Sequence, residues 1–221
     1  MTKESKALNI KRATLGGEIA DQSILKALKN TFNDIKITHI YASTEVGVGF
    51  AVTDGLAGFP YAYVEHGLDN IQIKIDEASL LWINPTSKEQ EYIANNSIYD
   101  NDGFINTGDL VKIENNRVFF LGRASGSINV GGNKVQPEEV EAKLLASNLL
   151  SNAFVYSKKN PIMGSLVCAD VVAINKNQNK IALKKQLLSY CRENLENFKI
   201  PAILKIVDDL AVTQSGKIKR N

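Results

Sequence analysis

The stretch GRASGSINVGGNKVQPEEVE, residues Gly122–Glu141, decides how this chain is divided. An apolar run that is typical of a strand, residues 118–121, ends abruptly where this stretch begins. The small residues 124–127 that follow are too poor in apolar side chains to form core, so they indicate a domain boundary. Pro137 then predicts the start of a helix, because proline fits a first helical position and the glutamates after it complement the helix dipole.

Composition bounds the class of protein. The chain has 221 residues, 44% apolar and 23% charged, which is ordinary for a globular protein of one or two domains. The net charge of +2 gives no reason to expect a nucleic-acid partner. No apolar run approaches the roughly 20 residues of a membrane span, and the N-terminus lacks the pattern of a signal peptide. Cys168 and Cys191 are expected to be buried, reduced thiols, which favours a cytoplasmic protein.

Periodicity gives the expected elements of the first half. Residues Asp21–Asn33 show a helical period, with Ile24, Leu25, Leu28 and Phe32 on one side and Asp21 as the cap. A strand is expected at 35–42, ending in polar residues, as in the nucleotide sites of open α/β sheets. Strands dominate from residue 59, and Asn115-Asn116 is predicted to form a two-residue hairpin turn.

The second half is expected to follow a β-α-β-β-α-β order. We therefore predict an α+β protein. It comprises the end of an α/β nucleotide-binding subdomain (1–58), an antiparallel, barrel-like β subdomain (59–122), a hinge (123–127) and a mobile α+β C-terminal domain (128–221).

Four short motifs carry candidate chemistry, and each also has an ordinary structural interpretation. Tyr41-Ala42-Ser43-Thr44-Glu45 places a ring, hydroxyls and a carboxylate at one strand end, but it also fits a strand followed by a polar turn. Asp109, in a Gly-containing turn, suits ribose hydroxyls or simply a turn. Gly16-Gly17-Glu18 permits close approach of a ligand or is a flexible connection. Residues 213–220 are a solvated basic tail or present a mobile Lys217.

The order of these motifs resembles the adenylate-forming superfamily, which includes acyl-CoA synthetases, firefly luciferase and the adenylation domains of peptide synthetases. GGE, YASTE, TGDL, the GR…INVGGNKVQPEEVE stretch and TQSGKIKR appear in that family's order over essentially the whole chain. The form of the fourth motif is more similar to the acyl- or aryl-CoA ligases.

The resemblance implies a nucleotide site. Tyr41, followed by Ala42-Ser43, would stack on adenine, and Gly16-Gly17-Glu18 would line the other side of the base. Asp109 would bind the ribose hydroxyls of ATP or AMP, and Arg123 would assist from the hinge.

It also implies the reacting groups. Thr44 would contact the α-phosphate, Glu45 would hold Mg²⁺, and Lys217 would be the catalytic lysine. Gly131 and Gly132 would border the channel for pantetheine after the C-terminal domain rotates. A carboxylic acid would attack ATP to form an acyl-adenylate, and CoA or the phosphopantetheine of an acyl carrier protein would then displace AMP.

Three departures from the family pattern qualify the resemblance. The phosphate loop and the larger N-terminal region are absent, so the chain is expected to need that half in cis or in trans. Ala42 stands where the family has glycine. Ser125 replaces the hinge Asp or Lys, which leaves the energetics of rotation open. The alternative is a non-catalytic module that docks a carrier protein or a partner subunit.

Overall fold

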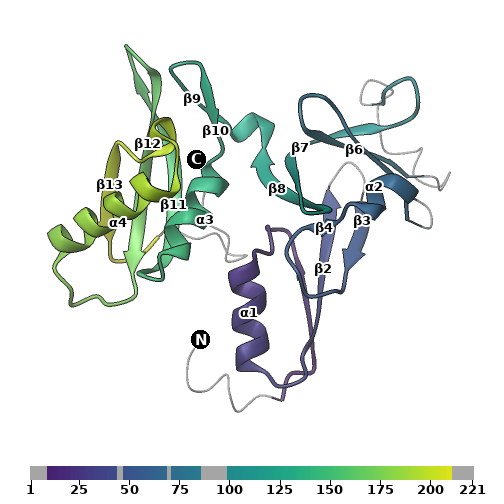
Figure 1. Ribbon diagram of the computed structural model, residues 1–221, viewed down its shortest axis with the longest axis horizontal. Helices are drawn as coiled ribbons and strands as arrows, with labels where there is room; N and C mark the ends of the chain where they lie inside the picture. Colours follow the sequence, from purple (N-terminus) through teal and green to yellow (C-terminus); the bar gives the residue numbers. More distant parts are fainter. Residues whose placement is uncertain (1–8, 44–46, 69–70, 86–98, 211–221) are drawn as a thin grey trace. The chain divides into compact units, whose positions relative to one another are not determined.

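The computed structural model describes residues 9–43, 47–68, 71–85 and 99–210. The chain folds into two compact units, Met1–Leu121 and Gly122–Asn221, each shown in Figure 1. The division falls between Leu121 and Gly122, where the joint between the units (residues 122–127) begins. The α+β class expected from the sequence is confirmed, whereas the finer domain boundaries and the rotation of the second unit stay predictions.

The first unit begins with a three-stranded sheet and one helix. Its elements are β1 (Arg12–Gly16), α1 (Gln22–Thr31), β2 (Lys36–Ser43) and β3 (Gly47–Val52). Strand β2 is central, with β1 parallel and β3 antiparallel to it. Helix α1 lies along this sheet (Figure 1).

The start of α1 follows the sequence prediction. Asp21 Oδ1 accepts the backbone N–H groups of Ser23 (2.8 Å) and Ile24 (2.9 Å), which satisfies two donors of the first turn. Leu25 is fully buried against β2. The expectation for Ile24 is wrong, because its side chain is 43% exposed and only the stripe through Leu25, Leu28 and Phe32 joins the core.

A five-stranded antiparallel sheet completes the first unit. Its elements are β4 (Phe59–Pro60), α2 (Ala62–His66), β5 (Ile71–Ile75), β6 (Leu80–Pro85), β7 (Ile105–Glu114) and β8 (Arg117–Arg123). The strand order is β4-β8-β7-β6-β5. The predicted turn between β7 and β8 is confirmed, since Asn115 and Asn116 have φ values of 50° and 58°, which this class of hairpin turn requires.

The second unit is a mixed sheet with two helices. Its elements are η3 (Ala124–Gly126), β9 (Ile128–Val130), β10 (Asn133–Val135), α3 (Pro137–Ala146), β11 (Leu150–Asn160), β12 (Gly164–Ala173), α4 (Lys180–Asn194), η4 (Asn197–Lys199) and β13 (Ile203–Val207). The predicted order lacked β10. Three residues are too few to show a strand period, and β10 exists because the Gly131-Gly132 turn folds it back onto β9.

Helices α3 and α4 cover the same face of this sheet. Alternate residues of β11 and β12 point to them, including Val155 and Ala169, and form one core with Leu144 and Leu187. Glu141 of α3 is also buried here, and its Oε1 accepts the backbone N–H of Val155 at 2.8 Å. The carboxylate therefore satisfies an amide on the outer edge of β11, which would otherwise be free to pair with another strand.

The joint is tied to α3. Gly122 has a φ of +137°, and a Cβ there would lie 2.3 Å from Glu138 Oε2, so only glycine fits. The amide of Gln136, directly before α3, donates to the hydroxyl of Ser127. Ser125 lies between Gly122 and Ser127 in the sequence, in the exposed turn η3. The joint is therefore an ordered turn, held against the start of α3 by Gln136 and Glu138.

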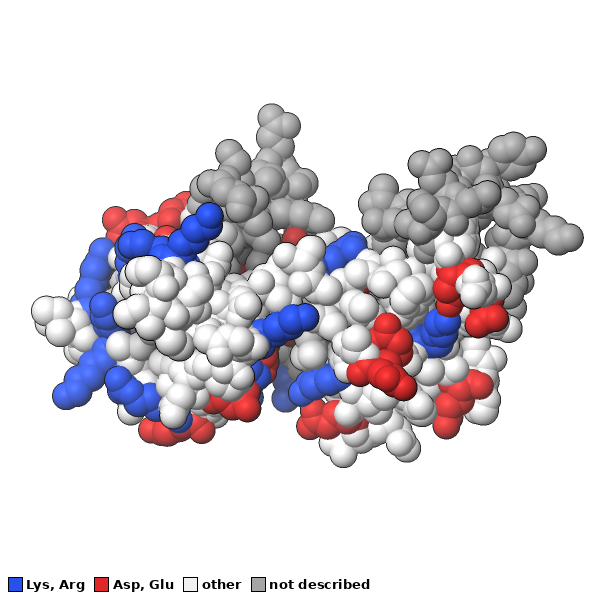
Figure 2. Space-filling view, turned by 90° about the horizontal axis from the view of Figure 1, so that it is seen from above, with Lys and Arg blue, Asp and Glu red and all other residues white. Residues whose placement is uncertain are grey.

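The surface carries both charges side by side, with no continuous field of one sign on the face shown in Figure 2. In the described part of the chain no helix is long and apolar enough to cross a membrane.

The two cysteines give a first prediction. Both are buried, and burial raises the pKa of the Cys168 thiol and that of Cys191, the latter to about 11. At pH 8 only about one Cys191 in a thousand would be thiolate, the reactive form. We expect 5,5′-dithiobis(2-nitrobenzoate) to label the folded chain roughly 100-fold more slowly than the chain in guanidinium chloride. Rapid labelling of both thiols in the folded chain would contradict this burial.

Candidate nucleotide-binding site

Two of the sequence-predicted residues meet in the first unit. Tyr41 lies near the end of β2 and Asp109 in β7, and they are 68 residues apart in the chain. The Tyr41 hydroxyl donates to Asp109 Oδ2 at 2.6 Å, the length of a hydrogen bond to an ionised acceptor. Both side chains are partly buried. The two motifs therefore form one site.

The ring of Tyr41 is held by residues that the sequence reasoning missed. It stacks on Phe50 with centroids 5.2 Å apart and on Phe120 at 5.0 Å. A Cβ at Gly49 would lie 2.9 Å from the Tyr41 ring, so the ring rests directly on that backbone. The signal was present, because a glycine inside an apolar strand indicates close approach of another group.

Asp109 lies within a strand, and the local turn that its sequence suggested is built into that strand, since Gly108 has a φ of +72° and donates its N–H to Asn106 Oδ1 at 2.8 Å. Residues Asn106–Asp109 belong to β7, and the pairing with β6 shifts register opposite Leu80–Trp82. Thr107 is buried, its hydroxyl donates to the carbonyl of Leu81 at 2.8 Å, and it accepts the Asp109 N–H at 3.2 Å. The irregularity re-aims the following side chain, as bulges near functional sites do. The TGD motif is thus a bulged strand that directs Asp109 toward Tyr41.

The glycine motif lies beside this pair. Gly16, the last residue of β1, pairs with Ile40 of β2, the residue before Tyr41. Gly17 has a φ of +81°, which turns the chain away from the sheet, and Glu18 is exposed. Ala42 is exposed one residue after Tyr41, where the pairing of β2 with β3 is irregular. These residues surround the end of β2.

Three further candidates, Arg123, Gly131 and Gly132, lie in the second unit. Arg123 is exposed at the end of β8, within the second unit. Gly131 and Gly132, with φ values of +58° and +90°, form the turn between β9 and β10. Gly131 donates its N–H to the carbonyl of Met163 at 2.9 Å, so the tip of the β11–β12 hairpin lies against the turn. Their roles toward the nucleotide and the thiol stay predictions.

Thr44, Glu45 and Lys217 lie outside the described residues, as does the side chain of Ser43. The phosphate contact, the Mg²⁺ ligand and the catalytic lysine therefore stay predictions. Within the described ranges no three His, Cys, Asp or Glu side chains gather in a group that could hold a metal ion.

Comparison with known proteins decides the family. Residues 139–217 match the AMP-binding enzyme C-terminal domain. These residues belong to the C-terminal domain of the AMP-binding enzymes. The chain is 28% identical over 228 residues to the 2-succinylbenzoate–CoA ligase of Listeria innocua, an alignment covering 96% of this chain and 45% of the ligase. It is 32% identical over 120 residues to the 3,4-dihydroxybenzoate–[aryl-carrier protein] ligase of Bacillus anthracis, covering 54% of this chain and 27% of that ligase.

The fold agrees with that of solved AMP-binding enzymes. ATP-bound MatB from Rhodopseudomonas palustris superposes with a TM-score of 0.74 at 21% identity, over 93% of this chain and 43% of MatB. This chain thus spans less than half the length of each relative, and corresponds to the C-terminal part of an AMP-binding enzyme.

Proposed function

We propose that the chain is the C-terminal part of an ATP-dependent carboxylate–thiol ligase. Such an enzyme would form an acyl-adenylate and pass the acyl group to CoA or to the phosphopantetheine of a carrier protein. The observation that carries the proposal is the contact of Tyr41 with Asp109, because it brings two motifs of the adenylate-forming pattern to one place. The names of the relatives, a CoA ligase and a carrier-protein ligase, support the reaction class.

The first unit would bind the nucleoside. The Asp109 carboxylate would accept hydrogen bonds from the ribose hydroxyls, sharing or replacing the one it receives from Tyr41. Adenine would lie against the exposed part of the Tyr41 ring or displace one of the two phenylalanines stacked on it. Gly16 and Gly17 would allow the backbone to approach the other side of the base.

The first half-reaction would depend on charge. A carboxylate oxygen attacks the α-phosphorus of ATP, the bond to pyrophosphate breaks, and acyl-AMP forms. Two anions must meet, so a cation between them lowers the barrier. Lys217 would supply that charge, Thr44 would contact the α-phosphate, and Arg123 would assist at the ribose. Mg²⁺, held by Glu45, would neutralise phosphate charge when bound.

The second half-reaction would transfer the acyl group. The sulfur of the thiol attacks the acyl carbon, the thiol loses its proton, and AMP leaves. Gly131 and Gly132 would border the path of the pantetheine arm. The hinge at 123–127 would allow the second unit to rotate. This rotation would move Lys217 out of the site and bring the Gly131-Gly132 turn to it, and Ser125 would absorb part of the change in backbone dihedral angles. The two buried free thiols favour a cytoplasmic location.

Pyrophosphate exchange tests the proposal. The chain with ATP, Mg²⁺ and a panel of carboxylic acids is expected to give little or no exchange, because it spans less than half the length of the ligases it matches. The chain joined to, or mixed with, an N-terminal half should exchange with at least one acid. Robust exchange by the chain alone would refute the need for the other half. No exchange in either case, with retained binding to a carrier protein, would favour the docking module instead.

A further inference from the structure

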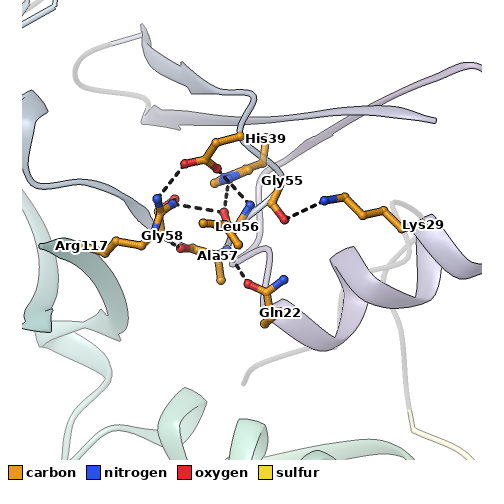
Figure 3. A network of polar contacts seen from close by, with 9 residues as sticks. Gln22, Lys29, His39, Gly55, Leu56, Ala57, Gly58 and Arg117 are labelled. Atoms are coloured by element: carbon orange, nitrogen blue, oxygen red, sulfur yellow. Dashed lines mark hydrogen bonds and ion pairs between the residues drawn. The ribbon is translucent and has the colours of Figure 1, made fainter. Parts of the chain in front are cut away.

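The nucleotide site has a second group of polar contacts behind it, formed by the loop that joins β3 to β4, residues Asp54–Gly58. Arg117 of β8 donates to this loop through all three guanidinium nitrogens. Nη1 contacts Asp54 Oδ2 at 2.7 Å and Nε the carbonyl of Ala57 at 3.0 Å. Nη2 lies 3.2 Å from the carbonyl of Gly58 and 3.4 Å from that of Leu56. We call these contacts the Arg117 clamp (Figure 3).

Two other elements hold the same loop. Gln22 Oε1 of α1 accepts the Ala57 N–H at 3.0 Å, and Lys29 Nζ donates to the carbonyl of Gly55 at 3.3 Å. His39 of β2 lies with Nε2 3.0 Å from the carbonyl of Leu56, to which it donates when that nitrogen carries the proton. Figure 3 shows these side chains converging on the loop from α1, β2 and β8.

The clamp is more than a surface ion pair. The Arg117 side chain is only 16% exposed and that of Asp54 35% exposed. Burial raises the pKa of Asp54, but the hydrogen bond and charge of Arg117 outweigh it, so the pKa of this carboxyl is lowered and it stays ionised. An arginine is needed, because a lysine has one nitrogen and cannot make the planar set of contacts.

The clamp joins the two sheets that each contribute one residue to the site. The Leu56 carbonyl lies between His39 on β2, two residues before Tyr41, and Arg117 on β8, three residues before Phe120. The sheets also meet in a shared apolar core, where Phe50 and Val52 of β3 pack with residues of the five-stranded sheet. They meet again at the site itself, where Tyr41 contacts Phe120 and Asp109. Apolar packing is non-directional, whereas the hydrogen bonds of the clamp depend on angle and so fix how the two sheets are set against each other. A small error in the angle between the sheets would separate Tyr41 from Asp109.

We propose that Arg117 is a positioning residue, which holds Tyr41 against Asp109 through the loop Asp54–Gly58 and so pre-forms the nucleoside site. The inference rests on the proposed function for its consequence in ATP binding, but not for the geometry.

The test places 3-fluorotyrosine at position 41 of the 221-residue chain and follows its ¹⁹F resonance. Asp54→Asn and Arg117→Lys are expected to shift or broaden this resonance, and to weaken ATP binding, titrated on the same signal, by roughly tenfold, because misplacement of binding groups is costly. Asp54→Asn keeps the proposal testable if Arg117→Lys does not fold.

Two controls separate positioning from loss of stability. Lys180→Gln removes an exposed ion pair with Asp208 in the second unit. Lys74→Gln removes the pair with Asp100, in the same sheet as Arg117 but away from the loop. Both should leave the resonance of residue 41 and the ATP affinity unchanged, even where they lower the denaturation midpoint.

The resonance of residue 41 and the ATP affinity together test whether Arg117 positions Tyr41. An unchanged resonance and affinity in both clamp variants would overturn the proposal, as would equal effects in the controls. A shifted resonance in a chain that does not bind ATP would support the clamp and count against the proposed function.

Discussion

Lys217→Ala, in the chain completed by its N-terminal half, is expected to lower the rate of acyl-adenylate formation by about 100- to 1,000-fold. The lysine would stand between the attacking carboxylate and the α-phosphate, where negative charges converge. Its loss would therefore raise the energy of the transition state more than that of bound ATP. The effect should appear in kcat of pyrophosphate exchange, with a much smaller change in KM for ATP.

The second half-reaction provides the internal control. If rotation of the second unit removes Lys217 from the site, transfer from a chemically prepared acyl-adenylate to the thiol should stay within about threefold of the unchanged protein. Lys219→Ala is the matched variant, since it removes the same charge two residues away. Acyl-adenylate formed at an undiminished rate by Lys217→Ala would show the catalytic assignment to be wrong.

Asp109→Ala should weaken ATP and AMP binding by roughly 100-fold, the loss expected for two charge-assisted hydrogen bonds to ribose. The bulged strand around Thr107 aims this carboxylate, so the neighbouring backbone should survive the change. Adenine without ribose should bind both proteins alike. Calorimetric titration with AMP and adenosine, against adenine, measures the difference.

Tyr41→Phe is the matched variant for this site. It keeps the ring that stacks on Phe50 and Phe120 but removes the hydroxyl that donates to Asp109. One hydrogen bond contributes about 1 kcal/mol to the free energy of binding, and the Tyr41 hydroxyl either orients Asp109 or competes with the ribose for it. AMP affinity should therefore rise or fall by no more than about fivefold. Equal AMP affinity in Asp109→Ala and the unchanged protein would remove the ribose role from Asp109.

Much of the fold could be predicted because local chemistry and long-range packing agree. Asp21 caps α1, the Asn115-Asn116 turn closes its hairpin, and Pro137 begins α3, all as the sequence indicated. The strands β1 and β3 escaped prediction. β1 has a mixed pattern (RATLG), and the glycines of β3 weaken its strand signal.

The candidate site was predicted in its residues but not in its geometry. Periodicity does not show that Tyr41 and Asp109, on different sheets, lie within hydrogen-bonding distance. The sequence indicated a glycine turn at the TGD motif but did not show that this turn is a bulge within a strand, because a bulge depends on the partner strand. The Arg117 clamp could not be predicted, since three of its four acceptors are backbone carbonyls, which carry no sequence signature.

Photolabelling of the chain with 8-azido-ATP tests the central claim most directly, because it reports where the adenine lies without requiring turnover. Label should appear in the peptides around β2, at or near Tyr41. AMP should protect against it, and Asp109→Ala should require roughly 100-fold more 8-azido-ATP for the same extent of labelling. Label confined to the second unit, or label that AMP does not displace, would contradict a nucleoside site formed by Tyr41 and Asp109.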